Sequence, residues 1–154
     1  MKRLLIIYHS QSGGTTRLAE AVLRGAQSIE AIEAIDVQCK RAFDAGVDDL
    51  LAAAGLIIGT PENFGYMSGA VKDFFDRTYY PCEHGLAGKP YGLFVRAGND
   101  GTGAVFNIDR ILAGLKMKKV FEPIIIKGAI TDAHLAHCEE LGATIAAGIA
   151  YGMF

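Results

Sequence analysis

Short runs of consecutive apolar residues alternate along the chain with stretches in which apolar positions recur every three or four residues. Residues 4–7, 56–60 and 91–95 are apolar almost throughout and too short for a helix with one apolar face. Such runs are typical of strands buried on both faces of a parallel sheet. Residues 34–39 alternate apolar and polar positions, which predicts a strand near the sheet edge. Residues 118–126 form a further candidate strand, and Pro123 within it places its outer part at the rim of the sheet.

Helical spacing fills the intervals between these strands. We expect helices after the turn at residues 10–16, over residues 47–54, after Ser68 as an N-terminal cap, around Ile108 and over residues 135–149. Residues 81–89 are expected to form a polar connection. Strand and helix therefore alternate five times, which predicts an α/β fold: a five-stranded parallel sheet, order 2-1-3-4-5, with helices on both faces and right-handed crossovers.

Composition narrows the class of protein. The chain has 154 residues, of which 51% are hydrophobic, so we expect one domain spanning residues 1–154. The net charge is −2 and no polybasic run is present, which argues against nucleic acid and anionic membrane surfaces as partners. No apolar stretch reaches membrane-spanning length, and the apolar run at residues 4–7 is too short for a signal core. A cytoplasmic protein is the expectation.

The cysteines indicate free thiols rather than disulfides. Cys39, Cys82 and Cys138 are odd in number, widely spaced and without a CxxC pair, as is usual in a reducing compartment. Cys82 with His84, and His134 with His137, do not show the spacing of a zinc site. We therefore expect no metal site.

Three turns rich in glycine and hydrogen-bonding groups follow predicted strands, at residues 10–15, 61–66 and 96–103. Carboxyl ends of adjacent parallel strands meet at one edge, so these turns should converge on one cleft. The first turn leads from a strand into a helix, and its free N–H groups, hydroxyls and the helix dipole suit a phosphate. It contains neither GxxxxGK[ST] nor GxGxxG. The alternative is that its Ser and Thr side chains only cap the helix.

Two motifs carry a resemblance to a known family. The sequence Ser10-Gln11-Ser12-Gly13-Gly14-Thr15 is similar to the phosphate loop of the flavodoxin-like FMN proteins, which has the form [ST]-x-[ST]-G-x-T after an apolar strand. Residues 59–78, GTPENFGYMSGAVKDFFDRT, resemble the corresponding segment of the tryptophan-repressor-binding-protein type of NAD(P)H:quinone oxidoreductases and of NADPH-dependent FMN reductases. The resemblance implies a flavodoxin-like three-layer sandwich with FMN as cofactor and NAD(P)H as electron donor.

The resemblance also implies roles for single positions. The FMN phosphate would be held by backbone and hydroxyl donors of Ser10, Gln11, Ser12, Gly13, Gly14 and Thr15. The isoalloxazine would be flanked by Pro61, Glu62, Asn63, Phe64 and Gly65, with the backbone there facing N5 and O4. The ribityl chain and pyrimidine edge would meet Ala97, Gly98, Asn99, Asp100 and Gly101. No side chain is required as catalytic acid or base, because the flavin carries the chemistry.

Two functional hypotheses follow. The first is a flavoenzyme that passes reducing equivalents from NAD(P)H through FMN to a quinone or similar small acceptor. The second is an FMN electron carrier serving a protein partner, although the nearly balanced charge lacks the acidic face expected of such a carrier. A third class of protein, a phosphoacceptor regulator, needs acidic residues at the strand ends, and this sequence lacks them there. Candidate residues for lining the open face of the flavin are Tyr66, Tyr79, Tyr80, His84 and Arg96. The alternative for each is that it is only a surface or packing residue. The exposed part of the last helix is a candidate surface for a homodimer.

Overall fold

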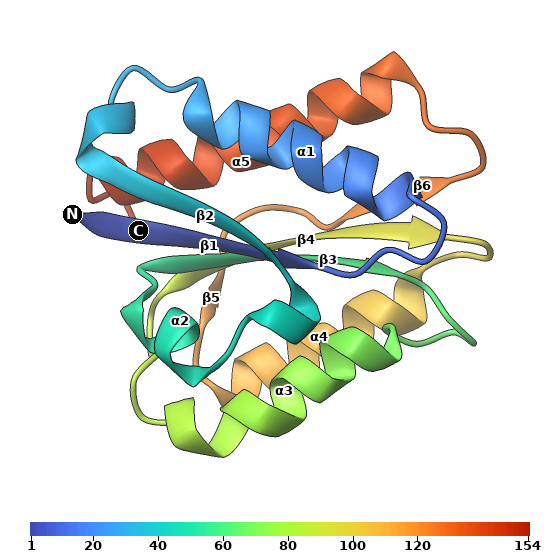
Figure 1. Cartoon of the computed structure of the whole chain (residues 1–154), viewed down its shortest axis with the longest axis horizontal. Helices are drawn as coiled ribbons and strands as arrows, with labels where there is room; N and C mark the ends of the chain where they lie inside the picture. Colours follow the sequence, from blue (N-terminus) through green and yellow to red (C-terminus); the bar gives the residue numbers. More distant parts are fainter.

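A computed structural model describes residues 1–154 and shows three layers, with a parallel sheet between two layers of helices (Figure 1). The strands are β1 (Lys2–Tyr8), β2 (Ile35–Arg41), β3 (Gly55–Pro61), β4 (Pro90–Ala97), β5 (Lys118–Lys119) and β6 (Ile124–Lys127). The helices are α1 (Gly14–Gln27), α2 (Val47–Ala52), α3 (Gly69–Cys82), α4 (Thr102–Gly114) and α5 (Asp132–Ala150), with short 3₁₀ turns η1 (Ile32–Ala34) and η2 (Ala42–Asp44). The predicted fold class is confirmed.

The sheet has the predicted order, β2-β1-β3-β4-β5, and every pairing is parallel. Ile6 in β1 stands opposite Cys39 on one side and Ile57 on the other, so β1 and β3 are central while β2 forms an edge. The predicted fifth strand is divided into β5 and β6, both paired with β4. Pro123 lies in the gap between them, as expected of a residue that cannot donate to the ladder.

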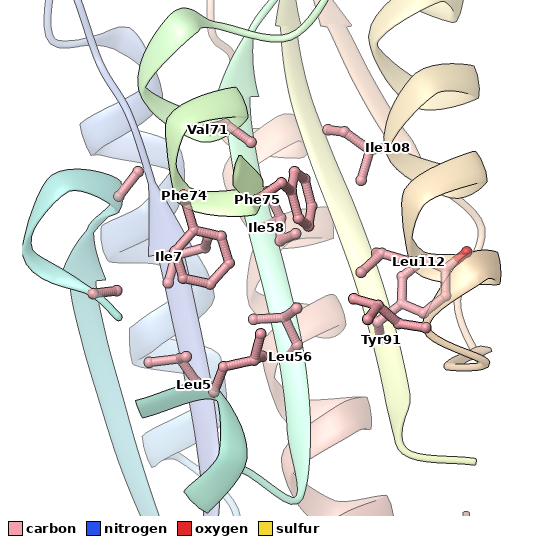
Figure 2. Packing of buried hydrophobic residues seen from close by; sticks show 14 of the residues in the cluster. Leu5, Ile7, Leu56, Ile58, Val71, Phe74, Phe75, Tyr91, Ile108 and Leu112 are labelled. Carbon is pink, nitrogen blue, oxygen red and sulfur yellow. The ribbon is translucent and has the colours of Figure 1, made fainter. Parts of the chain in front are cut away.

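One face of the sheet packs against α2, α3 and α4. Leu5, Ile7, Leu56 and Ile58 point to this side and meet the aromatic rings of α3, which are buried with them (Figure 2). Ser68 caps α3, as predicted, because its Oγ accepts the Val71 N–H at 3.3 Å. This cluster fixes where α3 begins, and therefore where the preceding loop ends.

The other face is covered by α1 and α5, which lie side by side (Figure 1). Their backbones approach closely: a Cβ on Gly25 would overlap the carbonyl oxygen of Glu139, and one on Gly142 would overlap that of Val22. Gly25 and Gly142 therefore permit the close contact between the two helices. This contact holds α1, and the loop in front of it, against the rest of the domain.

The segment after β3 differs from the sequence expectation in one respect. Residues 81 and 82 belong to α3 and not to a polar connection, because Cys82 is buried and extends the helix past Pro81. Leu86 anchors the remaining connection in the same core. Helix α2 ends at Ala52 and α5 begins at Asp132, each within three residues of the prediction. No helix combines the length and apolar character needed to cross a membrane.

Candidate functional site

The three predicted turns lie together at the carboxyl edge of the sheet. They follow β1, β3 and β4, which are adjacent, and the chain order reverses between β1 and β3 because β2 lies on the other side of β1. Open α/β sheets bind ligands at this kind of switch point. Two hydrogen bonds join the second and third turns: the Glu62 N–H donates to the Arg96 carbonyl at 2.9 Å, and the Asn99 N–H to Glu62 Oε1 at 3.2 Å.

The first turn, residues 9–13, leads into α1 and leaves donors free. The first backbone bond of the helix is Arg17 N–H to Gly13 oxygen, so the N–H groups of Gly14, Thr15 and Thr16 have no acceptor within the chain. Gly13 has φ of 93° and open space where a Cβ would lie. The first turn of α1 carries no acidic side chain. This cradle of free N–H groups, open above Gly13, fits a phosphate.

The hydroxyls of this turn have different roles. Ser10 Oγ accepts the Gly13 N–H at 3.0 Å and so shapes the turn itself. Gln11 and Ser12 are exposed. Thr15 is only 2% exposed, and because no fully buried side-chain oxygen in the chain lacks a partner, its unpaired hydroxyl keeps some contact with solvent. The alternative that these side chains only cap α1 is wrong, because the N-cap Gly13 has no side-chain cap bond.

Arg96 lies beside the first turn. It is half-buried on β4, and a Cβ on Gly14 would stand 3.3 Å from its Nε and 3.7 Å from Ile130 Cδ1. No carboxylate is within ion-pair distance of its guanidinium. The sequence hypothesis put this side chain on the open face of a flavin, whereas the structure puts its charge next to the N-terminus of α1.

The second turn is a tight hairpin that exposes an aromatic ring. Asn63 and Tyr66 exchange two backbone hydrogen bonds, of 2.8 and 2.9 Å, and the two residues between them have positive φ, 54° for Phe64 and 71° for Gly65. These angles define a type I′ turn, in which Asn or Gly is preferred at the position of Phe64. The Phe64 side chain is fully exposed. The ring therefore does not pack the loop against the core.

The base of this loop is closed by a buried threonine. Thr60 Oγ1 donates to the Pro61 carbonyl at 2.8 Å and accepts the Ser68 N–H at 2.9 Å. Thr60 and Ser68 are buried, while Glu62 and Asn63 are half-buried between the base and the tip. The hairpin that carries Phe64 is thus fixed at both of its ends.

The third turn caps α4. Asp100 Oδ1 accepts both the N–H and the hydroxyl of Thr102, at 2.9 and 2.8 Å, and these hydrogen bonds lower the pKa of Asp100. Gly98 and Asn99 are exposed, whereas Ala97 and Gly101 are buried, and a Cβ on Gly101 would lie 2.6 Å from Ile125 Cγ2. Ala97 and Gly101 can therefore meet a ligand only through their backbone.

Gly103 belongs to the site and was not singled out from the sequence. A Cβ on Gly103 would overlap the carbonyl oxygen of Gly65, so the start of α4 lies directly against the type I′ turn. The sequence signal available was the Gly-Thr-Gly spacing at the start of a helix. Contact between the second and third turns therefore depends on this residue as well as on Glu62.

Three residues proposed for the open face lie elsewhere. Tyr79 and Tyr80 lie near the end of α3, and His84 follows it, at the opposite edge of the sheet, where the Tyr79 ring would meet a Cβ on Gly114 at the end of α4. Only Tyr66 remains beside the hairpin. The cysteines are free, and burial raises the pKa of Cys39 to about 11 and, with Glu139, that of Cys138 to about 12. No group of three or more His, Cys, Asp or Glu side chains is arranged so that it could hold a metal ion.

Comparison with known sequences decides the family. The sequence model of the family described as NADPH-dependent FMN reductase matches residues 3–131. The chain belongs to this family. Among similar curated members and relatives, a flavodoxin of Aquifex aeolicus is 36% identical over 103 residues, covering 67% of the chain and 54% of the relative. An NAD(P)H dehydrogenase (quinone) of Acidithiobacillus ferrooxidans is 35% identical over 114 residues, covering 62% and 56%. This FMN reductase family chain thus spans little more than half the length of these relatives.

Solved structures support the fold of this FMN reductase family member. A flavodoxin from the domain Archaea superposes with a TM-score of 0.80 at 27% identity, covering 96% of the chain and 98% of that structure. A WrbA-like flavodoxin from Agrobacterium tumefaciens gives a TM-score of 0.75 at 20% identity, with 98% and 99% covered, and supports the fold alone. The predicted flavodoxin-like architecture is confirmed.

Proposed function

We propose that this chain binds FMN at the carboxyl edge of its sheet and passes reducing equivalents from NAD(P)H to a quinone or similar small acceptor. The observation that carries the proposal is the cradle at the start of α1. Three successive backbone N–H groups there lack acceptors, and the space next to Gly13 is unfilled. Membership of the NADPH-dependent FMN reductase family supports FMN as the occupant. Quinone dehydrogenases among the relatives support the class of acceptor.

Each turn has a separate task in this proposal. The donors of residues 10–15 hold the phosphate, and Arg96 supplies positive charge beside it. The hairpin 61–65 places the Phe64 ring and its backbone donors against the isoalloxazine, and residues 97–101 meet the ribityl chain and pyrimidine edge. FMN supplies hydride and electron transfer when bound, while the protein orients it and limits access of water. The chain's own side chains are not required to move a proton.

A second candidate is an FMN electron carrier for a protein partner. It is favoured by the Aquifex aeolicus relative, which is named a flavodoxin, and by the archaeal flavodoxin structure. The net charge of −2 counts against it, because steering a basic partner calls for a strongly acidic face. The two candidates share the site and differ in the speed with which NAD(P)H reduces the bound flavin.

The experiment that separates them is an anaerobic absorbance titration. The protein is reconstituted with FMN, desalted, and mixed with NADPH or NADH while the flavin band is recorded. Rapid bleaching supports the oxidoreductase, and retained flavin that stays oxidised supports the carrier. Loss of all flavin on desalting contradicts tight binding and leaves FMN as a dissociable substrate, which a titration at high FMN concentration then tests.

The placement of the phosphate is tested by Gly13→Val. A side chain at this open position with positive φ obstructs the approach of a phosphate, so FMN binding should be lost. Gly88→Val is the matched control, because Gly88 also has positive φ, 79°, and open space around it, but lies in the connection before β4. Equal FMN affinity in both folded variants would contradict the placement.

A cytoplasmic location also belongs to the proposal, and so does a homodimer, but the structure does not favour α5 as its interface. The exposed positions of α5 are mostly small or polar, including Ala136 and Thr144, so any dimer through this helix would bury little apolar area. Light scattering of the purified chain with and without FMN measures the oligomeric state directly.

A further inference from the structure

A cavity of about 330 Å³ opens beside the phosphate loop, at the carboxyl ends of β1 and β2. Its lining residues are Tyr8, His9, Ser10, Thr16, Arg41 and Phe43, and we call it the Phe43 pocket. Ser10 and Thr16 also border the phosphate cradle, so pocket and cradle are continuous. The pocket lies on the β2 side of the cradle, whereas the turns proposed for the isoalloxazine follow β3 and β4 on the other side. FMN ends at its phosphate and has no part that would enter this pocket.

The aromatic wall of the pocket is an exposed ring on a fixed turn. Phe43 is 63% exposed, while Ala42 and Ala45 on either side of it are buried and hold the turn η2 in place. The ring of His9 stands edge-on to Phe43, with centroids 6.1 Å apart and planes at 76°. An exposed aromatic ring that contributes nothing to the core offers a surface on which a planar base can stack.

The pocket also provides charge and hydroxyl groups. Arg41 is its only lysine or arginine, and no carboxylate is among the lining residues. The Arg41 guanidinium is exposed and forms a surface ion pair with Asp44 at 2.9 Å. Ser10, Thr16 and Tyr8 add hydroxyls. A cation, hydroxyls and an aromatic face next to the proposed phosphate site match a second phosphate, a ribose and a base.

We propose that the Phe43 pocket binds the adenylate part of a dinucleotide, with the base on Phe43 and its phosphate between Arg41 and the phosphate loop. The inference rests on the proposed function, because it takes the neighbouring cradle as the site of the flavin phosphate. Two dinucleotides contain this unit. In FAD it is joined to the flavin phosphate, and in NAD(P)H it belongs to the electron donor. A volume near 330 Å³ suits one mononucleotide unit rather than a whole dinucleotide.

The test compares Phe43→Ala with Tyr151→Ala in the full chain. Tyr151 is a matched control, since it is 61% exposed and follows α5 at the opposite edge of the sheet. Apoprotein is titrated with FMN, FAD and AMP, and FMN-loaded protein with NADP⁺, by flavin fluorescence and calorimetry. Stacking of a base on an aromatic ring predicts that Phe43→Ala weakens binding of the adenylate-containing ligand by about tenfold or more. FMN affinity should not change in either variant.

The outcomes identify the source of the adenylate. If Phe43→Ala weakens FAD but not NADP⁺ binding, the pocket serves a flavin dinucleotide, and the reverse result assigns it to the electron donor. If neither FAD, AMP nor NADP⁺ binding responds to Phe43→Ala, the inference is wrong. Failure of wild-type protein to bind FMN would instead overturn the proposed function. The effect of Phe43→Ala on AMP binding to apoprotein would then test the pocket independently of FMN.

Discussion

Replacing Phe64 with Asn should make the apoprotein more stable while weakening its hold on FMN. Phe64 occupies the left-handed region, with φ of 54°, and its side chain is fully exposed. A residue with a Cβ pays roughly 1–2 kcal/mol for this conformation, and Asn adopts it more readily. Since no buried contact is lost, we expect Phe64→Asn to raise the free energy of unfolding by about 1 kcal/mol. For a chain of this size that corresponds to a rise in Tm of about 2–4 °C.

On this reasoning, Phe64 is retained despite its strained backbone because its ring contacts the flavin. Loss of one aromatic stacking contact is worth about 0.5–1.5 kcal/mol, so FMN affinity should fall by about twofold to twelvefold. Lys116→Asn is the matched control, because Lys116 is the other non-glycine residue with positive φ, 60°, and lies beyond α4 at the opposite edge. It should stabilise the apoprotein and leave FMN affinity unchanged.

The measurements are urea unfolding of the apoproteins and fluorescence titration with FMN. A fall in the stability of apo Phe64→Asn would show that the ring supports the loop, and would refute the strain argument. Increased stability with unchanged FMN affinity would refute the assignment of Phe64 to the isoalloxazine. Lys116→Asn shows whether any gain comes from relief of a left-handed backbone in general.

Three further predictions concern other contacts. Gly103→Ala should push the Gly65 turn away from α4, which should lower the free energy of unfolding in urea by about 1–3 kcal/mol and weaken FMN binding. Unchanged stability and FMN affinity would contradict the contact. Arg96→Gln should weaken FMN binding by about tenfold but leave riboflavin, which has no phosphate, unaffected, whereas equal losses would place Arg96 at the ring. Burial acts to raise the pKa of Asp49, but hydrogen bonds from Lys40 and a backbone N–H lower it overall. Asp49→Ala should therefore lower the free energy of unfolding by about 1 kcal/mol at pH 7, and this loss should shrink as the pH falls below about 4. A loss that stays constant down to pH 2 would disprove the reasoning.

The fold was predictable because the sequences of the central strands suit few positions other than the middle of a parallel sheet. Residues 4–7 and 56–60 are apolar on both faces, and only the middle of a parallel sheet buries both. The split of the last strand followed from Pro123. The extension of α3 past Pro81 was not predictable, because it depends on the burial of Cys82 against elements distant in sequence.

The site was predictable in outline but not in its contacts. Turns at the ends of adjacent strands meet for topological reasons, so residues 10–15, 61–65 and 97–101 could be grouped from the sequence. Tyr79 and Tyr80 were grouped with them because they follow the same motif, yet α3 carries them away at about 1.5 Å per residue. Phe43 carried no sequence signal, since its place beside the first turn depends on the pairing of β2 with β1.

The close contact of α1 with α5 joins two helices from opposite ends of the chain. During synthesis, β4 is complete before α5 exists. A Cβ on Gly92 would meet Leu141 and Ile145 of α5, so this part of the sheet lacks its cover until α5 has been made. Contacts of such high sequence separation form slowly and leave apolar surface open to aggregation meanwhile. Because α5 also supports the helix behind the phosphate cradle, a nascent chain truncated before residue 132 should be unable to retain flavin. We therefore expect the chain to bind the cofactor only after α5 has docked on α1.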